Sequence, residues 1–246
     1  MHRLLVESAL LDEESPVLPA DAARHLKVLR PKNGEEIELF DGKGKWRVYS
    51  FGGDRDVAAP LRATSQTSQT SQTSRILTLF ACVTKGSRWD WTIEKATELG
   101  VTRIVPVISE RTIVRIPKGE RAAKRERWMR IAEDAARQSD AKWLPEICEA
   151  VDFKDALPLV RETTCFIGAL TNPPSSPLLK AVEDLRRETG DLKGLSTFIG
   201  PEGDFTSEEL AALMEIATPT SFGPTILRAE TAAIYAVSVL AATLDV

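Results

Sequence analysis

The alternation of apolar and polar residues changes once along this chain, and the change divides it in two. Between residues 1 and 62, several short segments alternate apolar and polar positions, which predicts strands at 3–6, 34–40 and 45–51. Residues 19–29 instead space their apolar positions as a helix does. Short strands joined by tight turns such as Asp41-Gly42 are typical of a small β-barrel.

From residue 76 onward, apolar runs alternate with segments of helical spacing. The runs predict strands at 76–83, 101–108, 164–170 and 195–199, and the other segments predict helices at 89–99, 177–187, 207–217 and 231–243. A strand, a helix and a second strand in succession favour a parallel sheet with right-handed crossovers. We therefore expect a layered α/β domain.

Between these two parts, residues 64–74 repeat Thr, Ser and Gln without any apolar side chain. Such a segment cannot bury surface, so we expect an exposed loop or an interdomain linker. We place the boundary here, which gives one domain of residues 1–73, linker included, and a second domain of residues 74–246.

The composition limits the class of protein. The chain has 246 residues, 43% of them hydrophobic, and a net charge of −4, so a nucleic-acid partner would need a local basic patch. Cys82, Cys148 and Cys165 lie in apolar runs without a CxxC spacing, which favours buried, reduced thiols and a cytoplasmic location. The chain has only 2 histidines, which argues against a multi-histidine metal site. No stretch approaches the roughly 20 apolar residues of a membrane helix, so we expect neither a metal nor a membrane partner.

Two stretches near the C-terminus combine Gly and Pro where an apolar run meets a helical segment. They are 198–205 (Phe-Ile-Gly-Pro-Glu-Gly-Asp-Phe) and 222–232 (Phe-Gly-Pro-Thr-Ile-Leu-Arg-Ala-Glu-Thr-Ala). Open α/β sheets bind ligands at such strand ends. Gly200 and Gly203 can adopt positive φ angles and let a ligand approach the backbone closely, and Thr206 with Glu209 predicts a capping box. Neither stretch has the spacing of a Walker A or Rossmann loop, so the pair predicts another kind of ligand site, although either alone could be a plain connection.

These two stretches resemble the cofactor loops of SPOUT-class RNA methyltransferases. With Lys85-Gly86-Ser87-Arg88 and the segment 94–101 (Glu-Lys-Ala-Thr-Glu-Leu-Gly-Val), the resemblance narrows to the RsmE family, which methylates N3 of a uridine in 16S ribosomal RNA. It covers essentially the whole chain. It implies an N-terminal PUA-like RNA-binding β-barrel domain and a C-terminal SPOUT α/β domain with a trefoil knot. It also implies S-adenosyl-L-methionine as cofactor, and either 16S rRNA or the assembled small ribosomal subunit as partner.

In this family three loops hold the cofactor in a bent shape, and the first of them is matched here by little more than a strand end. The cofactor-binding residues that the resemblance implies are Leu170, Thr171, Asn172, Ile199, Gly200, Pro201, Glu202, Gly203, Phe222, Gly223, Ile226, Leu227, Arg228 and Thr231.

Methylation of a uridine at N3 requires that nitrogen to lose its proton. A nearby cation would stabilise the developing uracil anion, and a carboxylate would accept the proton. Arg228 is the expected cation, and Glu202 or Glu230 is the expected acceptor. Either glutamate could instead hold Arg228 or the cofactor in place, and Glu230 could simply favour the positive start of its helix.

Basic residues in both parts of the chain are candidates for RNA contact. The segment 111–130 is dense in Arg and Lys and contains only Glu120 and Glu126 as acids, although such a run is often an ordinary solvated helix face. The expected RNA-binding residues are Arg3, Arg24, Arg30, Lys85, Arg111, Arg115, Lys124, Arg125, Arg127 and Gln138.

One loop departs from the family, which usually carries Glu-Gln-Ser/Cys-Gly-Arg shortly before Pro-Glu-Ile. Residues 137–141 read Arg-Gln-Ser-Asp-Ala here, and Asp204 likewise stands where a second Gly is common. A non-catalytic RNA-binding protein of the same fold and a methyltransferase with another RNA target therefore remain alternatives. The small residues of 229–242 favour a homodimer through close helix packing, unless that helix packs only on its own sheet.

Overall fold

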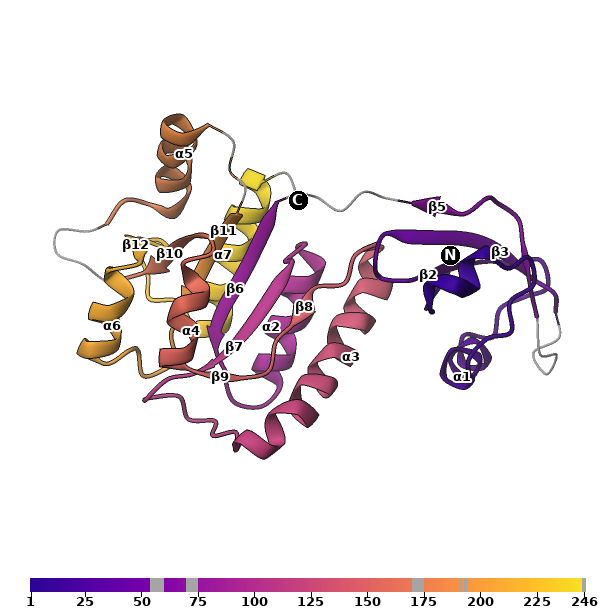
Figure 1. Cartoon of the computed structure of the whole chain (residues 1–246), viewed down its shortest axis with the longest axis horizontal. Helices are drawn as coiled ribbons and strands as arrows, with labels where there is room; N and C mark the ends of the chain where they lie inside the picture. Colours follow the sequence, from indigo (N-terminus) through magenta and orange to yellow (C-terminus); the bar gives the residue numbers. More distant parts are fainter. Residues whose placement is uncertain (54–59, 70–74, 170–174, 191, 193, 245–246) are drawn as a thin grey trace. The chain divides into compact units, whose positions relative to one another are not determined.

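The computed structural model describes residues 1–53, 60–69, 75–169, 175–190, 192 and 194–244 (Figure 1). Its contacts divide the chain into two compact units. The first contains Met1–Gln72 and Glu133–Leu144, and the second contains Thr73–Ala132 and Pro145–Val246. The sequence pattern did not anticipate that residues 133–144 belong with the N-terminal unit.

The first unit is built on a sheet with strand order β1-β2-β3-β4, and β5 pairs with β3. Its strands are β1 (His2–Leu5), β2 (Glu36–Phe40), β3 (Lys45–Phe51), β4 (Leu61–Ala63) and β5 (Ser68–Gln69). The 3₁₀ helix η1 (Ser8–Asp12) and the helix α1 (Ala20–Leu29) precede β2. Leu11 and Leu26 from these helices share one core with Ile37, Leu39 and Tyr49 of the sheet. The helix and the two longer strands that the pattern predicts are therefore present.

The Thr-Ser-Gln segment is not wholly a loop. Ser68 and Gln69 pair antiparallel with Trp46 and Lys45. Strand pairing is made by backbone hydrogen bonds, so the lack of apolar side chains gave no sign of it. Residues 70–74 of the segment lie outside the described residues.

The second unit contains a parallel sheet with strand order β12-β10-β11-β6-β7-β8, with β9 also paired to β7. Every pair in it is parallel. Its strands are β6 (Ile76–Cys82), β7 (Arg103–Ile108), β8 (Glu146–Ile147), β9 (Val151–Asp152), β10 (Thr164–Gly168), β11 (Gly194–Ile199) and β12 (Ala217–Thr220). The α-helices among the described residues after β6 are α2 (Ser87–Glu98), α3 (Arg121–Ser139), α4 (Phe153–Val160), α5 (Leu178–Thr189), α6 (Ser207–Met214) and α7 (Ala229–Leu244), and a 3₁₀ helix η2 (Lys118–Glu120) precedes α3.

The two faces of this sheet bury separate cores, which makes the unit a three-layer α/β domain. Leu77, Leu79 and Ala81 of β6 belong to one core, and Phe80 and Cys82 belong to the other, as the two-residue repeat of a strand requires. Helices α2, α5, α7 and the first part of α3 cover the first face, and α4 and α6 cover the second (Figure 1). The predicted α/β domain with a parallel sheet is thus confirmed, while the trefoil knot stays a prediction of the resemblance. Among the described residues, no helix combines the length and apolar character of a membrane span.

Two details of the predicted elements are wrong. The helix expected at 207–217 ends at Met214, and Ala217–Thr220 forms β12, which pairs with β10. Its Pro219 is tolerated because β12 is the last strand in the order. The strand expected at 164–170 ends at Gly168. The sequence pattern also gave no prediction of α4, β8 or β9.

Candidate active site

A cavity of about 450 Å³ lies in the second unit, within the range of small-molecule sites. It is lined by the ends of β10, β11 and β12, by the loops that follow β11 and β12, by the start of α7 and by one side chain of α2. Because these strands are parallel, their carboxyl ends share one edge of the sheet, and β10 separates β11 from β12. The two Gly-Pro loops therefore come together around one cavity, as the sequence predicts.

Most of the residues expected to bind the cofactor line this cavity: Ile199, Gly200, Pro201, Glu202, Phe222, Gly223, Ile226, Leu227 and Arg228. Gly203 and Thr231 are not among the lining residues. Leu170, Thr171 and Asn172 lie outside the described residues. Sequence reasoning missed Arg88, Gly168, Ala169 and Asp204, which line the cavity as well.

Gly200 and Gly203 do not use the positive φ angles that glycine allows. Positive φ angles occur at Gly223 and at Asp204, with values of 122° and 60°, and not at Gly200 or Gly203. Gly200 is needed for close packing instead, because a Cβ there would lie 3.0 Å from Cε2 of Phe205. Gly168 is tighter still, since a Cβ there would lie 2.6 Å from Cε2 of Phe222. Glycine thus lets aromatic rings pack directly on the strand ends.

Charged side chains of α2, α7 and the loop after β11 lie close together beside the cavity. Arg88 on the first turn of α2 lies 3.5 Å from Oε1 of Glu202 and 3.7 Å from Oε1 of Glu230. The Glu230 side chain is only 14% exposed. Arg228 is exposed, and its guanidinium makes no ion pair with any other described residue. Two carboxylates and two guanidinium groups are therefore available beside one cavity.

Arg111 ties the loop after β7 to the loop after β11. Its Nη1 donates to the carbonyl of Gly203 at 3.0 Å and to that of Phe205 at 3.3 Å. Next to it, the backbone N–H of Glu110 donates to Oε1 of Glu209 at 2.8 Å. Glu209 also completes the predicted capping box with Thr206 at the start of α6. Arg111 therefore shapes the loop that lines the cavity, whatever else it contacts.

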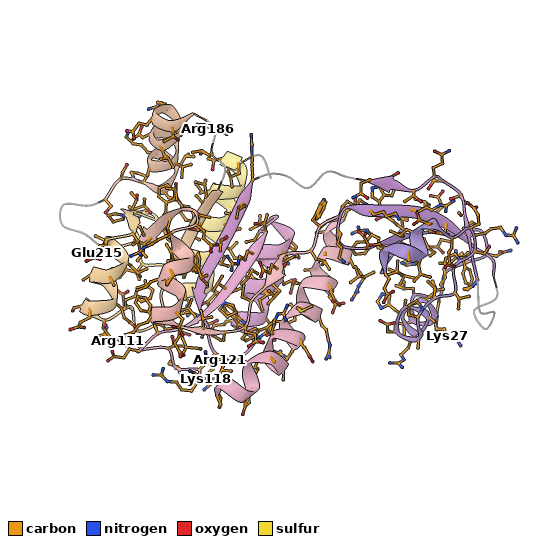
Figure 2. All side chains as sticks on the ribbon, viewed as in Figure 1. Lys27, Arg111, Lys118, Arg121, Arg186 and Glu215 are labelled. Atoms are coloured by element: carbon orange, nitrogen blue, oxygen red, sulfur yellow. The ribbon has the colours of Figure 1, made fainter. Side chains whose placement is uncertain are left out.

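The other basic residues after β7 divide into those with internal partners and those without. Arg115 donates to the carbonyls of Ser109 and Glu110, and Arg125 donates to that of Ile147 at 2.7 Å. Arg127 forms an ion pair with Asp90. Lys124 is exposed and forms no hydrogen bond or ion pair with other described residues, and the same is true of Lys85 on the loop after β6. Figure 2 labels Arg111, Lys118 and Arg121 on the loop and helices that follow β7.

Of the candidates in the first unit, Arg3 is 7% exposed and points into the unit. It donates to Oε1 of Glu38 at 2.8 Å and to the carbonyls of Ala136 and Ala141 at 2.6 and 3.0 Å. Its guanidinium also stacks on the ring of Phe40. This network occupies the guanidinium of Arg3 inside the unit, and the RNA contact of Arg3 stays a prediction. Arg24, Arg30 and Gln138 are exposed.

The same network accounts for the loop that departs from the family. Asp140, where glycine is usual, has a φ of 62°, and Asp is one of the few residues that tolerate this region. Its Oδ1 lies 3.2 Å from Nε of Arg3 and 3.0 Å from Nζ of Lys142. The backbone requirement for glycine is thus met by an aspartate that the network also uses.

The thiols and the His25 imidazole lie outside this cavity, and burial shifts the pKa of each. Burial raises the pKa of Cys82 to about 11 and that of Cys165 to about 12, so both thiols are neutral near pH 7. Cys148 is only half-buried, unlike the expectation, and burial raises its pKa as well. Partial burial, and then the charge of Arg137, lowers the pKa of His25. Among the described residues, no three His, Cys, Asp or Glu side chains are arranged to hold a metal ion.

Comparison with known proteins extends these observations. Residues 71–241 match an RNA methyltransferase domain, and residues 18–50 match an RNA methyltransferase PUA domain. Ribosomal RNA small subunit methyltransferase E of Bacillus subtilis is 31% identical over 235 residues, which cover 93% of this chain and 91% of that protein.

Several solved structures resemble the whole chain, and two of them contain the cofactor. One is a ribosomal RNA small subunit methyltransferase E from Neisseria gonorrhoeae bound to S-adenosyl methionine, with 29% identity, a TM-score of 0.80, and coverage of 99% of this chain and 98% of that one. The other, from Legionella pneumophila in complex with the cofactor SAM, has 28% identity, a TM-score of 0.81, and coverage of 98% and 96%. With its PUA-like N-terminal unit and parallel α/β unit, this chain belongs to the RNA methyltransferase family that includes ribosomal RNA small subunit methyltransferase E.

Proposed function

We propose that this protein uses S-adenosylmethionine to methylate N3 of a uridine in the 16S ribosomal RNA of the small ribosomal subunit. The observation that carries the proposal is the cavity that both Gly-Pro loops enclose at the strand ends, in a chain of this family. Its volume suits a nucleoside-sized ligand. Related structures hold S-adenosyl methionine or SAM.

The residues of the cavity fit such a cofactor. The ends of β10 and β11 and the loop after β12 offer backbone groups for an adenine and a ribose, while Phe222, Ile226 and Leu227 add apolar surface. When bound, the cofactor supplies an electrophilic methyl group on a sulfonium. Since little covalent help is needed, the protein's task is alignment and the handling of one proton.

The charged residues are assigned as follows. Arg228 stabilises the negative charge that develops on the uracil oxygens as N3 loses its proton. Glu230 or Glu202 accepts that proton. Glu202 lines the cavity, whereas Glu230 has the less exposed side chain, so both carboxylates keep this assignment.

RNA would bind through exposed basic side chains of both units, among them Arg24, Arg30, Lys85 and Lys124. We further propose that the chain acts in the cytoplasm as a homodimer packed through α7. The partner is the 16S rRNA, free or in the assembled small subunit. The division into a PUA-like domain of residues 1–73 and a methyltransferase domain of residues 74–246 belongs to the same proposal.

Calorimetric titration of the full chain with S-adenosylmethionine tests the cofactor, and binding at one site is expected. Mass mapping of methylated nucleosides in ribosomal RNA, from cells with and without the protein, tests the target. A missing N3-methyluridine in the cells that lack it is the expected result. A different lost modification would favour another RNA target, and cofactor binding without any lost modification would contradict the methylation of ribosomal RNA.

Arg228→Ala tests the mechanism. We expect methyl transfer to fall by about a hundredfold or more, as when an electrostatic donor is removed from an active site. The free energy of unfolding should stay unchanged, because the exposed guanidinium makes no ion pair with other described residues. Undiminished turnover would remove Arg228 from the mechanism.

A further inference from the structure

Arg88 lies where three segments meet that are far apart in the sequence. It belongs to the first turn of α2, lines the cavity, and faces Glu202 of the loop after β11 and Glu230 of the first turn of α7. Its Nη1 is 3.5 Å from one carboxylate and its Nε is 3.7 Å from the other. One guanidinium therefore stands between the two carboxylates that could accept the uridine proton.

The surroundings of Glu230 show how much it depends on this cation. Its Oε2 is buried and has no hydrogen-bond partner among the described residues. Thr84 Oγ1 and Trp89 Nε1 are buried and unpartnered in the same way, and all three residues line one small hollow between β6, α2 and α7. A buried carboxylate without compensation is costly. Among the described residues, Arg88 is the cation that forms an ion pair with Glu230.

The planar guanidinium suits this position better than an ammonium would. It can present separate N–H groups to two carboxylates at once. The ammonium group of a lysine is a compact point charge and matches two carboxylates less well. Without a cation between them, Glu202 and Glu230 would repel each other across the site. The loop after β11 and the start of α7 would then lose the ion pairs with Arg88 that join them.

We propose that Arg88 is a positioning residue for methyl transfer, which acts by holding Glu202 and Glu230 together at the cavity. Through Glu202 it fixes the loop that follows β11, and through Glu230 it fixes the carboxylate at the start of α7. This inference rests on the proposed function. It assigns Arg88 a role through the carboxylates, in addition to that of Arg228 on the uracil.

The test compares Arg88→Gln, Arg88→Lys and a matched control, Arg187→Gln. Arg187 also joins two carboxylates, Asp184 and Glu183, but on the exposed surface of α5. Calorimetry with S-adenosylmethionine and single-turnover methylation of 16S rRNA are the two measurements. We expect Arg88→Gln to weaken cofactor binding about tenfold and to slow turnover further, with partial recovery of both in Arg88→Lys. The control should match the wild type in both.

A double-mutant cycle separates positioning from a general loss of structure. Because Arg88 acts through Glu202, the substitution Glu202→Gln should weaken cofactor binding by a smaller factor in the Arg88→Gln background than in the wild type. Thermal denaturation checks that each variant folds. If Arg88→Gln does not fold, Arg88→Lys replaces it in the cycle, because the lysine keeps a cation beside Glu230. Additive effects, or wild-type affinity and turnover in Arg88→Gln, would overturn the inference. If the wild type itself failed to bind S-adenosylmethionine, the proposed function would fail instead.

Discussion

Asp140 and Asp204 both have a backbone conformation that most residues avoid, with φ angles of 62° and 60°. In both places the resemblance to the RsmE family leads us to expect glycine. Aspartate tolerates this region because its short polar side chain bonds locally, and Oδ1 of Asp204 accepts from the N–H of Phe205 at 2.8 Å. At the scale of single residues, aspartate therefore adopts at both positions a conformation that glycine also allows.

This explanation predicts an order of stability at position 140. Asp140→Gly keeps the backbone conformation and loses only contacts of a side chain that is 72% exposed, which are worth little. Asp140→Ala loses the same contacts and also forces a Cβ into the left-handed region, at a cost of about 1 kcal/mol more. Urea denaturation of both variants measures the difference. An alanine variant as stable as the glycine variant would contradict the explanation.

The buried thiols predict a loss of stability at high pH. The ordinary thiol pKa is 9.0, and burial raises that of Cys165 to about 12, so the folded state disfavours its thiolate. The stabilising contribution of the neutral thiol is complete below pH 9 and is lost as the pH rises from there towards 12. Urea denaturation between pH 8 and pH 10.5 should therefore show a smaller decline for Cys165→Ala than for the wild type. Equal declines would show that this thiol does not contribute.

At the scale of elements, the loop after β11 owes its shape to Arg111 as well as to its own turn. The two bonds from Arg111 to the carbonyls of Gly203 and Phe205 join it to the loop after β7. An arginine that satisfies two backbone carbonyls orders that backbone, and its loss leaves both without this partner.

Arg111→Met tests this role against the RNA contact expected from sequence. Methionine keeps apolar bulk but donates no hydrogen bond, so we expect cofactor binding to weaken by about threefold to tenfold. The slope of RNA affinity against salt concentration should stay close to that of the wild type, because no phosphate contact is lost. Lys124→Ala is the matched control and should show the opposite pattern. A reduced salt slope with normal cofactor affinity in Arg111→Met would restore the RNA assignment.

The elements that the sequence predicted are those with a strong local signal. The apolar run of β11, its Gly-Pro turn and the Thr206–Glu209 capping box lie within about a dozen residues of one another, and all three are present. Strand β12 was missed because its four residues, Ala-Thr-Pro-Thr, follow a helix and include a proline. The short α4 was missed as well, and it contains Pro158. Local pattern cannot identify elements that tertiary pairing alone stabilises.

The same distinction applies to the site. The two Gly-Pro loops predicted the cavity from sequence. The partners of the two arginines could not be predicted in this way, because Arg88 lies 114 positions from Glu202 in the chain and Arg3 lies 133 positions from Ala136. Nothing near either arginine in the sequence indicates a buried or paired charge. Their roles could be assigned only once the fold had brought their partners to them.

At the scale of the whole molecule, a chain with a net charge of −4 must bind RNA through local excess of positive charge. Several arginines of the segment 111–130 form hydrogen bonds or ion pairs with other residues of the protein. Fewer cations are therefore available for phosphate contact than the sequence suggested. Lys118 and Lys124 are exposed and form no side-chain hydrogen bond or ion pair with other described residues. Of the segment's basic residues, these two lysines are therefore better candidates for phosphate contact than Arg125.

The double variant Lys118→Ala with Lys124→Ala tests that choice against Lys154→Ala with Arg161→Ala, which removes the same charge from exposed positions at α4 and its end. If the two lysines contact phosphates, the slope of log affinity against log salt should become shallower by about 1.4 for single-stranded RNA. The control pair should leave this slope unchanged, because removing net charge without a contact releases no counterions from the complex. Neither pair should alter the free energy of unfolding by more than about 0.5 kcal/mol, since exposed substitutions rarely do. Equal slopes for both pairs would mean that the RNA follows another surface and that the lysines are ordinary solvated charges.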